Sequence, residues 1–162
     1  MFNLIIIDCH DIGQHLGAYG WKTVPTKNLD ALAARGLLFK NNFCTAPQCS
    51  PSRSGIYTGR YPHANGMFGL AHAPFNWRLH AGEKHLAQIL RDAGYQTSLI
   101  GIQHLTSSDK HLIGKLGYEN IYDLPKAEDV GEMASKFLAE NTQAPFFLKI
   151  GFWYPHRDEN GR

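Results

Sequence analysis

Cysteine is scarce in this sequence. Only Cys9, Cys44 and Cys49 are present among 162 residues. An odd number of cysteines without a zinc-ligand spacing excludes a disulfide framework and a cysteine-rich metal knuckle. We therefore expect reduced thiols, as in a cytoplasmic protein.

Strong charge and long apolar runs are also lacking. The formal net charge is only +2, and Lys and Arg are scattered along the chain, so no nucleic-acid partner is expected. The apolar run from Leu4 to Ile7 is too short to span a membrane, and no basic leader precedes it in this chain. With 43% hydrophobic and 19% charged residues, the composition indicates one globular unit with a substantial core.

What the sequence does contain is an alternation of strand-like and helix-like segments. Continuous apolar runs predict strands at residues 3–8, 37–43, 95–101 and 145–152, the first of them buried on both faces. Apolar stripes at helical spacing predict helices at residues 27–35, 50 onward, 83–94 and 128–141, with Thr26 as a cap and Gly36 as a stop. Residues 59–82 are predicted to be irregular. The pattern is that of an α/β fold with a largely parallel sheet.

The stretch CSPSR, residues 49–53, places a thiol at an expected helix start. Ser50 is a suitable N-cap, and Pro51 suits the first helical position because its missing N–H needs no partner there. Cys49 would then lie at the positive end of the helix, where a thiolate or an anionic substrate is favoured. The alternative is a buried structural cysteine beside an ordinary capped turn.

Polar side chains follow three of the predicted strands. The first strand runs into Cys9, His10 and Asp11, the third into Gln103 and His104, and the last into Trp153, Tyr154, Pro155, His156 and Arg157. Ligands of open α/β sheets bind beyond the carboxyl ends of the strands, although any single loop histidine is also explained by simple solvation. With Cys49 and Arg53, this edge would carry a set of groups suited to hydrolysis of a tetrahedral oxyanion ester or amide.

CSPSR followed by SGIYTGRYPHANGM resembles the signature of the sulfatase family, in which a Cys-x-Pro-x-Arg motif directs oxidation of the cysteine to formylglycine. The segments IIIDCHDIG, PTKNLDALAARGLLFKNNFCTAPQCSPSRS, LRDAGYQTSLIGIQH and APFFLKIGFWYPHR are similar to family segments in order and spacing. NGMFGL, the FN after it and the closing PHR are most similar to the heparan N-sulfatase, or sulfamidase, branch. The resemblance covers essentially the whole chain.

The resemblance implies an alkaline-phosphatase-like sulfatase core, a largely parallel sheet sandwiched by helices, of which residues 1–162 would be an N-terminal and incomplete portion. It implies a formylglycine made from Cys49 by a maturation enzyme, whose hydrate attacks the sulfur of a sulfated sugar. Arg53 would hold the modified residue, and His104 and His156 would bind the sulfate or act as acid and base. Asp11, with position 49 and His10, would bind a divalent metal, calcium or alternatively magnesium.

Three positions depart from the family pattern. His10 stands where the family usually has an aspartate, and imidazole suits calcium poorly; Asp8 is a substitute carboxylate. Ile102 stands where a family lysine contacts the sulfate. The family's remaining metal ligands lie later than His156, so we expect an incomplete site that is inactive alone. Two alternatives remain open: a phosphonate or phosphate ester hydrolase of the same superfamily, or a catalytically silent carbohydrate-binding fragment.

Overall fold

The protein is described by a computed structural model covering residues 2–140 and 144–156. Within these residues the chain forms two compact units. The first contains residues 2–10 and everything described after residue 43, and the second contains residues 11–43. We describe each unit by itself.

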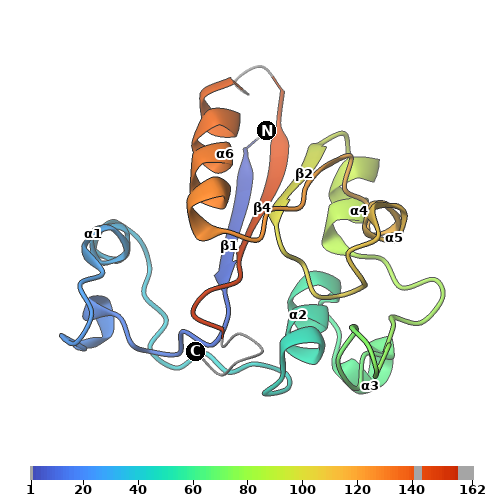
Figure 1. Cartoon of the computed structure of the whole chain (residues 1–162), viewed down its shortest axis with the longest axis horizontal. Coiled ribbons are helices and arrows are strands. Elements are labelled where there is room, and N and C mark those ends of the chain that lie inside the picture. The colour runs from blue at the N-terminus through green and yellow to red at the C-terminus, as the bar shows by residue number, and fades with distance from the viewer. Residues whose placement is uncertain (1, 141–143, 157–162) are drawn as a thin grey trace. The chain divides into compact units, whose positions relative to one another are not determined.

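The first unit is built on a four-stranded sheet (Figure 1). Its strands are β1 (Leu4–Cys9), β2 (Gln96–Gly101), β3 (Asn120–Tyr122) and β4 (Phe146–Phe152), in the order β1-β4-β2-β3. All three pairings are parallel, as predicted. The three-residue β3 was not predicted, because so short a segment carries no readable alternation. Parallel pairing brings the carboxyl ends of β1, β4 and β2 to one edge of the sheet.

Helices cover both faces of this sheet, which confirms the predicted layering. Helix α6 (Ala127–Glu140) contacts β2 and β4, whereas α4 (Leu86–Asp92) contacts β2 and also α2 (Cys49–Thr58). Two shorter helices lie in segments not predicted as helical, α3 (Pro62–Asn65) and α5 (Lys110–Lys115). None of the helices among the described residues is long and apolar enough to cross a lipid bilayer.

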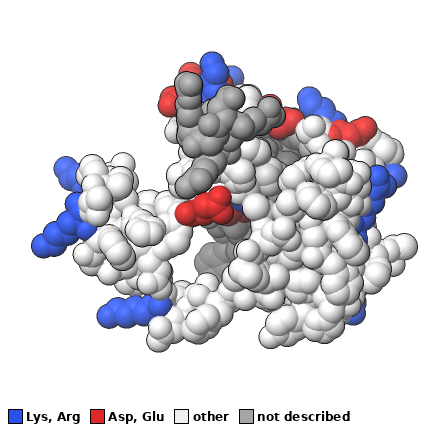
Figure 2. Space-filling model, turned by 60° about the horizontal axis from the view of Figure 1, so that its bottom comes forward, with Lys and Arg blue, Asp and Glu red and all other residues white. Residues whose placement is uncertain are grey.

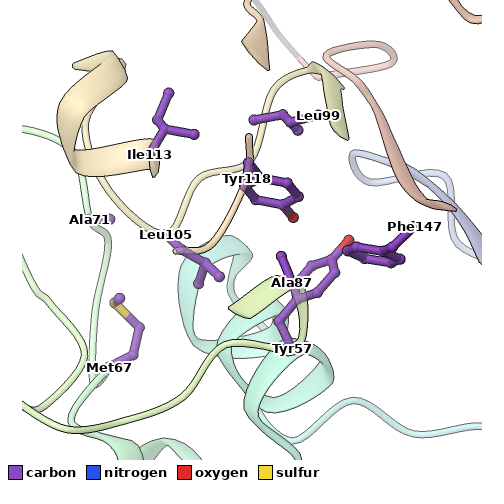
Figure 3. Packing of buried hydrophobic residues seen from close by; sticks show 9 residues of the cluster. All are labelled: Tyr57, Met67, Ala71, Ala87, Leu99, Leu105, Ile113, Tyr118 and Phe147. Carbon is purple, nitrogen blue, oxygen red and sulfur yellow. The ribbon is translucent and has the colours of Figure 1, made fainter. Parts of the chain in front are cut away.

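The core divides into two clusters, because successive side chains of a strand point to opposite faces. Phe147 and Leu99 pack with Tyr57, Ala87 and Ile113 on the side of α2 and α4 (Figure 3). On the side of α6, the buried members are Ile100, Val130, Ala134, Phe137, Phe146, Leu148 and Ile150. The alternation places Lys149 on the same face as Phe147, toward α2.

Strand β1 differs from the prediction of a strand buried on both faces. Leu4, Ile5 and Ile7 are 41%, 43% and 56% exposed. The reason is that β1 is an edge strand, with β4 as its only partner among the described residues. Apolar composition alone cannot tell an edge strand from a central one.

In two of the predicted helices, only part of the apolar face is buried. Val130 and Phe137 of α6 are buried, but Leu138 is 41% exposed, and Ile89 of α4 is 46% exposed. In α4 the fully buried residue is instead Ala87. Asn141, the predicted end of the last helix, lies outside the described residues.

The second unit contains a 3-10 helix, η1 (Gly17–Tyr19), and α1 (Lys27–Arg35), whose start and end match the prediction. Thr26 does not cap α1 through its side chain; its hydroxyl accepts from the Gly17 N–H and donates to Asp30. The strand predicted at residues 37–43 is absent. Phe39 and Phe43 are 63% and 87% exposed, and this unit has no other strand to satisfy the backbone groups of an extended segment.

Figure 2 shows how charged side chains are distributed on one face of the protein. On the face shown in Figure 2, Lys and Arg lie in several separate places with uncharged surface between them. This agrees with the formal net charge of only +2.

Candidate active site

Three histidines meet where β1, β2 and β4 end. His10 follows β1, His104 lies three residues after β2, and His156 lies four residues after β4. The ring centroid of His10 lies 4.6 Å from that of His104 and 4.8 Å from that of His156. Trp153 packs against all three rings, with centroid distances of 5.5, 5.2 and 4.9 Å. The predicted convergence of these strand ends is therefore confirmed for His10, His104 and His156.

Cys49 joins this histidine cluster from helix α2. Its sulfur and one ring nitrogen each of His10 and His104 all lie within 4.8 Å of one another. Cys49 is the first residue of the helix, and Gln48 occupies the N-cap position without a side-chain capping bond. The sequence had placed Ser50 at the N-cap and Pro51 at the first helical position, which is wrong. Ser50 is fully buried and its hydroxyl instead accepts a bond from the Ala71 N–H at 3.0 Å.

Arg53 lies one helical turn after Cys49 and is only 6% exposed. Its Nη1 donates to Oδ1 of Asp8 at 2.6 Å, and the Tyr57 hydroxyl donates to Oδ2 at 2.8 Å. The ammonium of Lys149, fully buried, lies 3.1 Å from Oδ1 and also donates to the Ile102 carbonyl. Asp8 thus forms ion pairs with two cations, and both of its oxygens accept hydrogen bonds or ion pairs from protein groups.

Burial and charge act against each other in this network. Burial alone would raise the pKa of Asp8, but Lys149 and Arg53 outweigh it and hold the pKa of that carboxyl below its ordinary value. Burial lowers the pKa of Lys149 to about 8, although Asp8 opposes the change. Arg53 and Lys149 carry two positive charges and Asp8 carries one negative charge, so this network has one positive charge in excess near the strand ends.

His104 lies in an unusual position within the site. Its φ is +57°, in the left-handed region, and its Nδ1 is buried with no hydrogen-bond partner among the described residues. Burial, together with His10 and the cations Arg53 and Lys149, lowers the pKa of His104 to about 3. The imidazole is therefore neutral at physiological pH in this form of the protein.

A cavity of about 640 Å³ opens beside these groups. Cys49, His104, Trp153 and His156 line it. Further lining residues are Leu70, His72, Gly101, Ile102, Gln103, Thr106, Ser108, Ile113 and Asp123. Four of the predicted chemical groups therefore belong to one region: Cys49, His104 and His156 line the cavity, and Arg53 lies one turn behind Cys49.

Asp11 and Arg157, two further residues singled out from the sequence, are not among the described residues of the first unit. Asp11 is exposed, has a φ of +48° and is the first residue of the second unit, so the site described here contains only residues of the first unit. Arg157, the last residue of the PHR segment, lies outside the described residues together with 158–162.

Sequence reasoning missed the role of Lys149 and Tyr57. A signal was present for Lys149, because a lysine inside the apolar run FFLKIGF must find a buried partner. Tyr57 gave no such signal, since a tyrosine in a helix is ordinary.

The chain belongs to the sulfatase family, whose model matches residues 3–160. Human N-sulphoglucosamine sulphohydrolase is 33% identical over 170 residues, which cover 96% of this chain and 32% of the relative. The chain thus spans about a third of the length of this curated relative.

Several solved structures share the fold of this chain. A 2-O GAG sulfatase is 25% identical with a TM-score of 0.77, covering 95% of this chain and 35% of that one. A structure in complex with its substrate D-glucosamine-2-N,6-O-disulfate is 24% identical with a TM-score of 0.76, covering 96% and 35%. The phosphonate monoester hydrolase of Agrobacterium radiobacter is 22% identical with a TM-score of 0.70, covering 96% and 41%. The last two likenesses concern the fold alone.

Proposed function

We propose that the protein hydrolyses a sulfuric ester or sulfamate of a sulfated sugar, using a formylglycine made from Cys49 by a maturation enzyme. The observation that carries this proposal is the position of Cys49: it begins helix α2, lines the cavity and contacts the histidine cluster. The human sulphohydrolase and the 2-O GAG sulfatase structure support a sulfated carbohydrate as the substrate class.

The charges around the cavity fit an anionic substrate. Lys149 donates to the carbonyl of Ile102, a residue of the cavity wall, and Arg53 uses Nη1 to hold Asp8. A guanidinium has five N–H donors in a planar fork, so Arg53 retains donors for a sulfate oxygen or for the residue at position 49. The excess positive charge of this pair over Asp8 favours a negatively charged group nearby.

We propose that the histidines transfer protons during the hydrolysis. As a hydrate, the formylglycine supplies the attacking oxygen. A neutral His104 can accept a proton, which an imidazolium cannot, and an anion in the cavity would stabilise the imidazolium that forms. His156, on the same cavity wall, would donate a proton to the leaving oxygen or nitrogen.

The metal that the family implies does not fit the described residues of the first unit. Calcium takes six to eight oxygen ligands, whereas the cluster offers the imidazoles of three histidines and the residue at position 49. The Asp8 oxygens are engaged by Arg53, Tyr57 and Lys149. The calcium site we propose through Asp11, position 49 and His10 therefore depends on oxygen ligands beyond this unit.

The test uses the full-length protein that carries this sequence, produced with the maturation enzyme. Peptide mass spectrometry should show Cys49 converted to an aldehyde, and turnover of an aryl sulfate or an N-sulfated sugar should vanish in Cys49→Ala. Unmodified cysteine in active protein would refute the formylglycine mechanism. Faster turnover of a phosphonate ester would favour the phosphonate hydrolase, and sugar binding without turnover the silent carbohydrate-binding protein.

A further inference from the structure

Before conversion, Cys49 is a thiol surrounded by nitrogen donors. His10 comes from the end of β1, His104 from the end of β2 and Cys49 from the start of α2. The three ligand atoms lie within 4.8 Å of one another. His10 is only 3% exposed, so this donor set is held inside the protein rather than on a mobile surface.

The separation of these donors is close to that of a metal site. With Zn–S and Zn–N bonds of about 2.3 and 2.05 Å, tetrahedral ligand atoms lie about 3.3–3.6 Å apart. Ligand atoms separated by the upper limit of 4.8 Å would therefore have to approach each other by at most about 1.2–1.5 Å to bind one zinc ion.

The chemistry of the donors selects the metal. Thiolate and imidazole are ligands of zinc and other thiophilic cations, whereas calcium and magnesium require oxygen. Within the first unit, Asp8 is the carboxylate nearest to His10 in the chain, and it is held by Arg53 and Lys149. The N-terminus of α2 favours the negative charge of a thiolate at Cys49.

A second observation points to a ligand at this place. Nδ1 of His104 is buried and has no hydrogen-bond partner among the described residues. A buried imidazole nitrogen without a partner has lost its hydrogen bond to water without replacing it, which destabilises the site. Coordination by this nitrogen would satisfy it.

We propose that the unconverted protein binds one zinc ion through the Cys49 thiolate and the imidazoles of His10 and His104, with water as the fourth ligand. Binding forms the sulfur–zinc bond and releases the thiol proton to solvent. Conversion of Cys49 to formylglycine removes the sulfur, so the zinc site and the mature residue exclude each other. A zinc-loaded Cys49 is therefore a poor substrate for the maturation enzyme. Zinc binding itself concerns the protein before conversion, whereas its exclusion by formylglycine rests on the proposed function.

The experiment uses the full-length protein produced without the maturation enzyme, stripped of metal and kept in excess calcium. Each cysteine is followed by peptide mass spectrometry during alkylation with iodoacetamide. We expect zinc to slow alkylation of Cys49 at least about tenfold and to leave that of Cys44, an exposed thiol, unchanged. Cobalt in place of zinc should give a thiolate-to-metal absorption band that is absent in Cys49→Ser.

The variants separate this site from any other zinc-binding group. Cys49→Ser should bind one zinc ion fewer than the unmodified chain, whereas Cys44→Ser should bind the same number. His104→Gln should weaken binding at least about tenfold. The proposal is overturned if zinc leaves Cys49 alkylation unchanged, if Cys49→Ser binds zinc as the unmodified chain does, or if the formylglycine form retains the ion.

Discussion

At the residue scale, Asp8 decides how the cations of the site are held. Sequence analysis considered it as a substitute metal ligand, but its carboxylate accepts from Arg53 and Tyr57 and lies 3.1 Å from the Lys149 ammonium. Its function in this structure is to fix the position of Arg53 behind Cys49. Removing one partner from a buried charge cluster is costly because the remaining charges lose their compensation.

We therefore predict that Asp8→Asn lowers the free energy of unfolding by about 3–5 kcal/mol, since Arg53 and Lys149 would be left buried without an anion. Chemical denaturation of the full-length protein measures this. The matched control is Asp92→Asn, whose ion pairs with Lys84 and Arg91 are partly exposed and should contribute less than about 1 kcal/mol. Equal losses in the two variants would contradict the assignment of Asp8.

For Lys149 we predict that losing its charge by deprotonation stabilises the protein at alkaline pH, in contrast to the loss expected for Asp8→Asn. The pKa of Lys149 is about 8 in the folded protein against an ordinary value of 10.5, so between pH 8 and 10 the unfolded chain binds more protons than the native one. Stability should therefore rise with pH in this window, by at most about 1.4 kcal/mol per pH unit. Lys149→Met should lack this rise and should lose little or no stability at pH 7, because Arg53 still balances Asp8.

Lys149→Met also tests whether the excess positive charge of Arg53 and Lys149 over Asp8 contributes to anion binding. If Lys149 stabilises an anion near the cavity, Lys149→Met should weaken inhibition by sulfate while its stability at pH 7 is preserved. A parallel fall in both quantities would show that Lys149 has only a structural role. Denaturation at several pH values and a sulfate inhibition assay supply the two measurements.

At the element scale, close approach of β2 and β4 at their carboxyl ends shapes the site. A Cβ atom on Gly151 would collide with the Lys149 ammonium and the Ile102 carbonyl, and one on Gly101 would collide with the Gly151 carbonyl. Gly101 also has a φ of +79°, which side chains disfavour. These glycines allow the Lys149 ammonium to reach the backbone between the two strands.

We predict that Gly151→Ala destabilises the protein by about 2 kcal/mol or more, because backbone atoms cannot yield as a flexible side chain does. The control is Gly131→Ala in α6, where a Cβ meets nothing within 4 Å. An alanine there should raise the unfolding free energy by about 0.5–1 kcal/mol through helix propensity. Thermal unfolding of both variants distinguishes the two effects, and destabilisation of similar size in each would contradict the steric explanation.

At the scale of the whole molecule, the outer edge of β1 is the exposed feature. Ile5 and Ile7 are largely exposed, and no described strand pairs beyond them. Open apolar strand edges promote association between chains. The chain also spans about a third of its human relative.

A protein made of these 162 residues alone is therefore predicted to self-associate and to hydrolyse no sulfate ester. Ile7→Lys should reduce the association, because a charged edge resists pairing, whereas Leu86→Lys, on the partly buried face of α4, should unfold the protein instead. Sedimentation velocity measures the association. Turnover of an aryl sulfate by this chain alone, abolished by Cys49→Ala, would disprove the prediction of inactivity.

Many of the secondary-structure elements could be predicted from local sequence pattern. The apolar runs of β1, β2 and β4 and the stripe of α6 predicted those elements, because burial of one face or both dictates residue type along the chain. Parallel order then predicted that His10, His104 and His156 would meet, since strand ends share one edge of the sheet. The resemblance of CSPSR to the sulfatase signature identified the family before the fold was known.

Other features were decided only by tertiary structure. Three features depend on neighbours distant in the chain: the helix start at Cys49 rather than after Ser50, the exposure of β1 and the absence of a strand at residues 37–43. The backbone N–H of Ala71 donates to the Ser50 hydroxyl. Strand β1 has a described partner strand on one side only. Lys149 could be recognised as unusual from sequence, but its partner Asp8 lies 141 positions away. Pairing of buried charges is a property of three-dimensional position, and local sequence pattern does not contain it.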